Sequence, residues 1–316
     1  MQKGQIVSKI EGIENWENPE LFYKNLEKYD IKNKNQYYNS SFAFLDTYLL
    51  PMTLNQSVSQ DEARFVNKKI KGRYLIKSLT QQDDIKLIDD LGIDIQREIQ
   101  SVYGNQIESQ KYQNGPYLVQ KYISNPLLIN KRKFDWNCLV GIISTDPLIV
   151  IFNNGYTKYN SNITEFQIFE AEEKIKAAIT YALLSVKDKI IDKKGQTQLL
   201  SVTFQLDENL DPFFIGVKNQ PFLKDQTDIQ TQVFSDFVRD YLDAVLALNN
   251  LTKEQIIKKQ IENQQFICNY VQRGFCKVLI NEAGKTDYIQ ENINLIQSWK
   301  VPYINQVQYS QLIDTG

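Results

Sequence analysis

The sequence predicts an α+β fold in which antiparallel sheets are flanked by helices. Three observations predict it. Residues 132–159 and residues 199–218 each contain two apolar strands joined by a turn, which is the pattern of an antiparallel hairpin. Residues 164–191 form an amphipathic segment between them, and residues 231–249 repeat apolar side chains at spacings of three and four. This order of hairpins and helices favours an α+β domain with helices packed on one side.

The N-terminal part also predicts a mixture of helix and strand. Residues 14–40 are polar and aromatic and predict a short helix with a loop, and residues 41–51 are apolar and end in a proline turn. Residues 59–69 place acids in the first turn of a helical pattern, which predicts a capped helix. Residues 72–79 and 117–123 have the apolar content of strands, and we expect the second of these strands to be buried.

Turn signals mark the loops of both hairpins. Residues 145–147, Thr-Asp-Pro, separate the strands of the first hairpin, and residues 207–209, Asp-Glu-Asn, separate those of the second. From residue 251 the chain begins with a Lys/Gln/Ile-rich helical pattern and then becomes polar and irregular. We therefore expect a helical tail after the second hairpin and its helix.

Composition excludes several classes of function. The 316 residues include no histidine, which removes Ser-His-Asp and Cys-His catalysis and most zinc or iron sites. The 36 basic and 38 acidic residues nearly cancel, so no strong basic field is expected to hold nucleic acid. Cys138, Cys268 and Cys276 include no CxxC pair and predict buried free thiols in a reducing compartment. With no secretory signal and no apolar run of about 18 residues, we expect a cytoplasmic protein without a membrane span.

One stretch is more specific than the rest. Val119 to Asp135 reads VQKYISNPLLINKRKFD and is followed by GIISTDPLIVIF. This order resembles the tubulin–tyrosine-ligase-like family, whose pattern is QKYI, a Pro-Leu-Leu-Ile tetrad, KFD and a strand with an SxDPL turn. The segment LDENLDPFFIGVKNQPFL matches another signature of that family in frame, and LDTYLLP and YLIKSL resemble two further motifs. The resemblance covers about residues 41–250, and its three ordered motifs argue against chance.

The resemblance implies an ATP-grasp fold, in which two α+β lobes clamp ATP and magnesium. Enzymes of this family join tyrosine, glutamate or glycine to a carboxylate of tubulin. The implied division places the N-terminal and central lobes in residues 1–115 and the C-terminal ATP-grasp lobe in residues 116–250. Residues 251–316 would then form a helical or irregular extension, which is a candidate partner-binding segment or a helix that packs on its own domain.

Several positions that hold ATP in the family are retained. The resemblance assigns them to a strand lysine, a hinge strand that reads adenine through its backbone, and the KFD motif. They are Lys77, then Gln120, Lys121, Tyr122 and Ile123, then Lys133 and Asp135. These residues outline a vestigial ATP pocket. The hinge residues are also what a buried central strand needs, so an alternative is that they serve the fold alone.

Other positions of the family site are changed. Asn137 stands where the family has an arginine that grips an acidic group, and an amide cannot form that charged fork. Thr203, Gly216 and Lys218 stand where the family has its metal ligands, although magnesium requires hard oxygen ligands. Lys218 could instead lie along a phosphate oxygen, pair with an acid, or be solvated at the strand end.

The loop that approaches the phosphates in the family is changed as well. The family has a Gly-x-Gly segment after the strand lysine, whereas this chain has no glycine there and carries Asp83 and Asp84. Two carboxylates at that place would repel a phosphate.

The residues therefore predict a protein that is not an enzyme and that acts as a structural or binding component. By resemblance, its partner would be tubulin, a microtubule assembly or axonemal proteins, and its place the cytoskeleton, in a cilium or flagellum. No metal is expected, and ATP binding is the only cofactor function left open. Two alternatives remain: an active ATP-dependent tubulin glutamate or glycine ligase with displaced metal ligands, and a nucleotide-binding sensor without turnover.

Overall fold

The computed structural model of the chain describes both hairpins and the helices around them. It covers residues 5–33, 38–50, 72–78, 85–88, 117–129, 131–156, 164–219, 228–271 and 277–298. The predicted helix at 59–69 lies outside the described residues, as do Asp83, Asp84 and Cys276.

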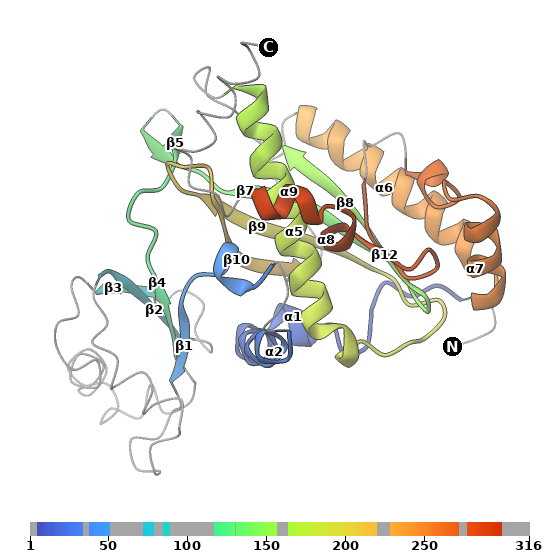
Figure 1. Cartoon of the computed structure of the whole chain (residues 1–316), viewed down its shortest axis with the longest axis horizontal. Coiled ribbons are helices and arrows are strands. Elements are labelled where there is room, and N and C mark those ends of the chain that lie inside the picture. The colour runs from blue at the N-terminus through green and yellow to red at the C-terminus, as the bar shows by residue number, and fades with distance from the viewer. Residues whose placement is uncertain are drawn as a thin grey trace.

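The larger of the two main sheets has six antiparallel strands in the order β10-β9-β7-β8-β11-β12 (Figure 1). These strands are β7 (Trp136–Thr145), β8 (Leu148–Tyr156), β9 (Gln198–Leu206), β10 (Pro212–Asn219), β11 (Lys277–Asn281) and β12 (Thr286–Asp287). Strands β7 and β8 form the first predicted hairpin, and β9 and β10 form the second, so both predictions are confirmed. Both form because runs of β-branched and aromatic residues are interrupted by short turns.

Two long helices pack on opposite faces of this sheet. Helix α5 (Glu165–Val186) packs on one face, where it forms a core with Cys138 and Val140, and Thr164 caps it with a capping box. Helix α6 (Asp228–Asn249) packs on the other face over Leu139 and Ile149. The prediction that helices lie on one side is therefore wrong. Neighbouring residues of β7 point to opposite faces and both are apolar, so both faces require a cover.

The second main sheet has four antiparallel strands in the order β1-β4-β2-β3 and lies to the left of the larger sheet in Figure 1. The strands are β1 (Thr47–Leu50), β2 (Tyr74–Ser78), β3 (Ile85–Ile88) and β4 (Tyr117–Lys121). Ile76 and Val119 are fully buried between them, as the strand predictions required. A two-stranded hairpin, β5 (Leu128–Ile129) with β6 (Arg132–Lys133), follows β4 along the chain and precedes β7.

The N-terminal segment contains more helix than the sequence predicts. Helix α1 (Glu14–Glu17) is followed by α2 (Pro19–Lys32) and a short 3-10 turn, η1 (Ser40–Phe42). The side chain of Asn18 accepts hydrogen bonds from the first turn of α2, and proline occupies its first position, so the start signal was present. Phe22 of α2 packs against Phe214 of β10, with ring centroids 5.1 Å apart.

The C-terminal segment joins the larger sheet. Helix α7 (Lys253–Glu262) confirms the helix predicted there, and η3 (Cys268–Tyr270), α8 (Tyr288–Glu291) and α9 (Ile293–Ser298) follow it. The expectation of only helix and irregular chain missed β11, which pairs with β8. That pairing joins segments more than 100 residues apart, so no local pattern announces it.

The predicted lobe boundaries at residues 115 and 250 stay predictions. The sheets cross both of them, because β4 pairs with β1 and β2, and β11 pairs with β8. Cys138 is buried, and burial raises the pKa of its thiol, whereas Cys268 is exposed, unlike the buried thiol that we expected. None of the helices in the described ranges combines the length and the apolar run that a bilayer crossing needs.

Candidate functional site

Lys77 and Gln120 lie next to each other on the four-stranded sheet. They belong to β2 and β4, which are paired in antiparallel register. The Nζ of Lys77 donates a hydrogen bond of 2.9 Å to the Oε1 of Gln120. The Nε2 of Gln120 donates in turn to the hydroxyl of Tyr23, at 2.9 Å, and to the Oγ1 of Thr47, at 3.2 Å. Gln120 is therefore held from three sides and fixes the direction of the lysine.

The ammonium of Lys77 is largely desolvated, and the described part of the chain provides no counter-charge for it. Burial lowers the pKa of Lys77, and within the described residues no carboxylate pairs with it. An ammonium has three N–H donors, and the hydrogen bond to Gln120 uses one of them. Such a group fits an anionic ligand, because a phosphate would supply both the missing charge and the missing acceptors. The lysine side of the pocket thus fits ATP.

The predicted hinge is a strand end whose backbone is partly occupied. The N–H of Lys121 donates to the carbonyl of Asp46, and the N–H of Tyr122 donates to the carbonyl of Arg73, both at 2.9 Å. Ile123 follows and is buried. Two of the hinge N–H groups are therefore used inside the sheet, as in any internal strand.

The two KFD residues lie beyond the hinge. The ammonium of Lys133, on β6, contacts the hydroxyl of Tyr122 and lies 4.3 Å from the centre of its ring. Asp135 is exposed in the link from β6 to β7. The structure thus brings Lys133 onto the hinge.

Three of the changed positions form one row across the larger sheet. Asn137 on β7 is paired in register with Thr203 on β9, which is paired in register with Gly216 on β10. The Oγ1 of Thr203 donates a hydrogen bond of 2.8 Å to the Oδ1 of Asn137. Lys218 lies two residues beyond Gly216 and is exposed opposite Ser201. We call Asn137, Thr203 and Gly216 the polar row.

The polar row does not fit a magnesium ion. It offers one amide and one hydroxyl, which already bond to each other, and no carboxylate, whereas protein-bound Mg²⁺ relies on carboxylate oxygen. Asp207 does not compensate, because it lies in the turn at the far end of the hairpin and accepts the N–H groups of Asn209 and Asp211. Within the described residues no three His, Cys, Asp or Glu side chains gather as a metal site would require.

Sequence reasoning missed the two residues that hold Gln120. Thr47 lies in the LDTYLLP motif, so the motif contained a usable signal. Tyr23 lies 97 residues before Gln120 on α2, and nothing in its local sequence marks it.

The comparisons with known proteins agree with the resemblance. The sequence model of the tubulin-tyrosine ligase family matches residues 1–167, more than half of the chain. Tubulin glycylase 3C of Tetrahymena thermophila is 22% identical over 284 residues, covering 72% of this chain and 25% of that protein. The inactive polyglycylase TTLL10 of Homo sapiens is 20% identical over 256 residues, covering 64% of this chain and 37% of that protein. The protein polyglycylase TTLL10 of Rattus norvegicus is 20% identical over 241 residues, covering 60% of this chain and 34% of that protein.

The chain thus spans about a quarter to a third of the length of these relatives. A solved structure supports the fold. The C-terminal domain of K. lactis Pby1, an ATP-grasp enzyme, superimposes with a TM-score of 0.50 at 16% identity, covering 79% of this chain and 78% of that one. The ATP-grasp prediction is confirmed at the level of the fold.

The comparisons contradict the prediction that the chain is not an enzyme. The Tetrahymena glycylase and the rat polyglycylase are named as enzymes, although the human relative is called inactive. The prediction rested on a few changed positions, and lost ligands at those positions are not sufficient to exclude catalysis by a site whose other residues remain.

Proposed function

Since the chain belongs to the tubulin-tyrosine ligase family, we propose that it is an ATP-dependent ligase that joins an amino acid to tubulin. The observation that carries the proposal is Lys77, a desolvated ammonium that a neutral amide holds in place and that no described carboxylate neutralises. The names of the relatives, tubulin glycylase and polyglycylase, support tubulin as the partner and glycine as the amino acid.

The chain's own residues bind and orient the nucleotide in this proposal. Lys77 donates to phosphate oxygens, and Gln120 keeps its ammonium directed because Tyr23 and Thr47 hold the amide. ATP, when bound, supplies the phosphoryl group that activates a carboxylate for attack by an amine.

The same proposal also accounts for the polar row and for Lys218 beside it. Because its residues do not fit magnesium, the row provides no metal ligand in this proposal. Lys218 is exposed at the end of β10, beside the row, where its ammonium can donate to a phosphate oxygen. In this proposal the charge of Lys218 takes the place of the metal charge that the family pattern implies.

The experiment is an assay of ATP-dependent incorporation of labelled glycine, and separately glutamate, into purified tubulin. We expect incorporation by the 316-residue chain and its loss in Lys77→Ala. Lys24→Ala is the matched control, because Lys24 is exposed and pairs with Glu20 on α2. Absence of incorporation, under conditions in which a glycylase of the same family works, would overturn the ligase proposal.

We also propose that the chain associates with microtubules in the cytoskeleton, with the axoneme of a cilium or flagellum as its assembly. The tubulin named in its relatives supports the first part of this proposal. Co-sedimentation of the purified chain with microtubules at physiological salt is the test. A chain that stays in the supernatant, alone and in its native complex, would contradict it.

A further inference from the structure

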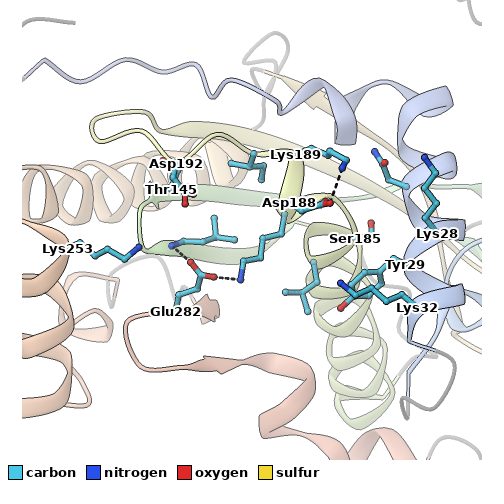
Figure 2. Close-up of a pocket in the computed structure, with 15 residues that line it drawn as sticks. Lys28, Tyr29, Lys32, Thr145, Ser185, Asp188, Lys189, Asp192, Lys253 and Glu282 are labelled. Atoms are coloured by element: carbon cyan, nitrogen blue, oxygen red, sulfur yellow. Dashed lines mark hydrogen bonds and ion pairs between the residues drawn. The ribbon is translucent and has the colours of Figure 1, made fainter.

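A cavity of about 630 Å³ lies at the end of α5 (Figure 2). Its walls come from α2, the turn between β7 and β8, the end of α5 with the 3-10 turn η2 (Lys187–Lys189), the start of α7 and the residue after β11. This volume is typical of a small-molecule site. None of the residues assigned to the nucleotide or to the polar row lines it.

Lysines from three separate parts of the chain line this cavity. They are Lys28, Lys32, Lys187, Lys189 and Lys253. Three carboxylates also line it, those of Asp188, Asp192 and Glu282. Asp146, which is not part of the lining, pairs with Lys253, so these five lysines and four carboxylates leave one net positive charge. Figure 2 shows Lys28 and Lys32 on one side, Lys253 on the other, and Asp188 and Glu282 between them.

Three of these ammonium groups are already paired. The pairs are Lys187 with Glu282, Lys189 with Asp188, and Lys253 with Asp146. Glu282 also accepts the N–H of Leu148, so its carboxylate is anchored to β8. Each paired ammonium still has N–H donors beyond the one used for its acid. These lysines can therefore donate to a ligand without losing their partners.

The other two lysines of the lining, Lys28 and Lys32, lie on α2. Lys28 and Lys32 are one turn apart on α2, and within the described residues neither makes an ion pair. Like charges at this spacing repel each other. The negative, C-terminal end of the helix dipole stabilises a cation at Lys32, which is in the last turn of α2. Lys28 lies one turn earlier and does not gain this stabilisation. An anion in the cavity would relieve the repulsion between them.

Neutral polar groups complete the wall. Asn25 is nine-tenths buried and lines the cavity; its amide nitrogen donates to Asn15, and its amide oxygen has no partner within the described residues. Tyr29 adds a hydroxyl from the same helix. A ligand with both anionic oxygens and a hydroxyl or N–H donor would satisfy these groups together with the lysines.

We propose that this cavity binds a phosphate-bearing ligand with at least two negative charges. A single carboxylate would meet three wall carboxylates and gain little, whereas a doubly charged phosphate matches Lys28 and Lys32, the two lining lysines that make no ion pair within the described residues. The ligand is either a soluble phosphate compound or the phosphorylated headgroup of a lipid, since both present the same oxygens. Neither Lys77 nor Gln120, which belong to the proposed nucleotide site, is among the lining residues.

The test is a thermal-shift titration of the 316-residue chain with tripolyphosphate, at an ionic strength held constant with sodium chloride. We expect a saturable rise in Tm. The double variant Lys28→Gln/Lys32→Gln should weaken the apparent affinity about tenfold or more, because it removes two charge-assisted contacts. Both side chains are exposed, so its Tm without ligand should match the parent and show that it folds.

Two control variants separate the possible origins of a shift. Lys24→Gln removes a lysine of the same helix that does not line the cavity and should leave the shift unchanged. The double variant is also compared with the parent in the Lys77→Gln background, where phosphate binding at the proposed nucleotide site is removed. A shift lost only in Lys77→Gln, a shift reduced equally by Lys24→Gln, or no shift at all would each overturn the proposal.

A flotation experiment with lipid vesicles distinguishes a lipid headgroup from a soluble phosphate compound. Phosphatidylcholine vesicles with phosphatidylinositol bisphosphate should retain the parent and release the double variant if the ligand is a lipid headgroup. A tripolyphosphate shift without retention on these vesicles would identify a soluble ligand. Retention that the double variant keeps in full would count against this cavity.

Discussion

One face of the six-stranded sheet has a covered half and an open half. Over β7 and β8, helix α6 covers the sheet with Phe237 and Tyr241, and the side chains there are buried. At the start of β7 and across β9 and β10 the same face carries Asn137, Thr203 and Gly216, which are only partly buried. The covered half stabilises the fold, and the open half is where polar side chains can meet a ligand.

Two glycines show the difference at the level of atoms. A Cβ on Gly141, in β7, would lie 2.8 Å from Cδ2 of Tyr241 and 3.0 Å from Cγ1 of Ile151. A Cβ on Gly216, in β10, would meet no atom of the described residues within 4 Å. Glycine in the covered half is required by packing, whereas glycine in the open half leaves room that a larger side chain could fill.

The largest effect is expected where α6 covers the sheet. Phe237→Ala should lower the free energy of unfolding by about 3–5 kcal/mol, because its ring is fully buried and leaves a cavity. Urea denaturation measures the change. Leu246→Ala, on the exposed side of the same helix, is the control and should change stability by no more than about 0.5 kcal/mol. Equal effects of the two variants would show that α6 does not bury its Phe237 side.

A smaller loss is expected from overpacking of the covered half. Gly141→Ala should lower the free energy of unfolding by about 1–3 kcal/mol, because its methyl group forces Tyr241 and Ile151 to move. The same denaturation experiment measures it. A neutral result would mean that α6 is free to shift away from β7.

The opposite sign is expected in the open half. Gly216→Ala should raise the free energy of unfolding by about 0.5–1 kcal/mol, because alanine costs less backbone entropy than glycine in a strand and meets no obstacle here. Gly141→Ala serves as its matched comparison. Destabilisation by Gly216→Ala would show that the open half is filled in solution.

The smallest expected effect is a change of stability with pH. Burial lowers the pKa of Lys77, so in the window between that lowered pKa and the ordinary lysine value the unfolded chain binds more protons than the folded chain. The stability of the parent should therefore rise with pH through this window. Lys77→Met should be more stable than the parent at neutral pH, with a difference that shrinks as the pH rises. Urea midpoints at neutral and alkaline pH measure this, and a difference independent of pH would contradict it.

Local patterns predicted most of the elements. The turns at 145–147 and 207–209 mark both hairpins, and the caps at Thr164 and Thr252 lie at the starts of predicted helices. These signals are local because a turn or a cap depends on neighbours within about four residues. Pairing of β11 with β8 and burial of both faces of β7 depend on distant segments, and both were missed.

The sequence likewise predicted only part of the candidate site. Motif order placed Asn137, Thr203 and Gly216 in one site, and the strand register shows that they form one row. The anchoring of Gln120 by Tyr23 was not predictable, because α2 reaches it only through the fold.

The sequence by itself determined the residue types: no histidine, no carboxylate in the polar row, and a lysine at position 77. It also determined the hairpins and helices, since their signals are local. Only the tertiary structure decided that α6 leaves half of a sheet face open, that Lys77 lacks a described acid partner, and that lysines 28, 187 and 253 surround one cavity. The physical reason is that burial and charge pairing depend on which distant segments pack together, and the identity of a residue does not contain that information.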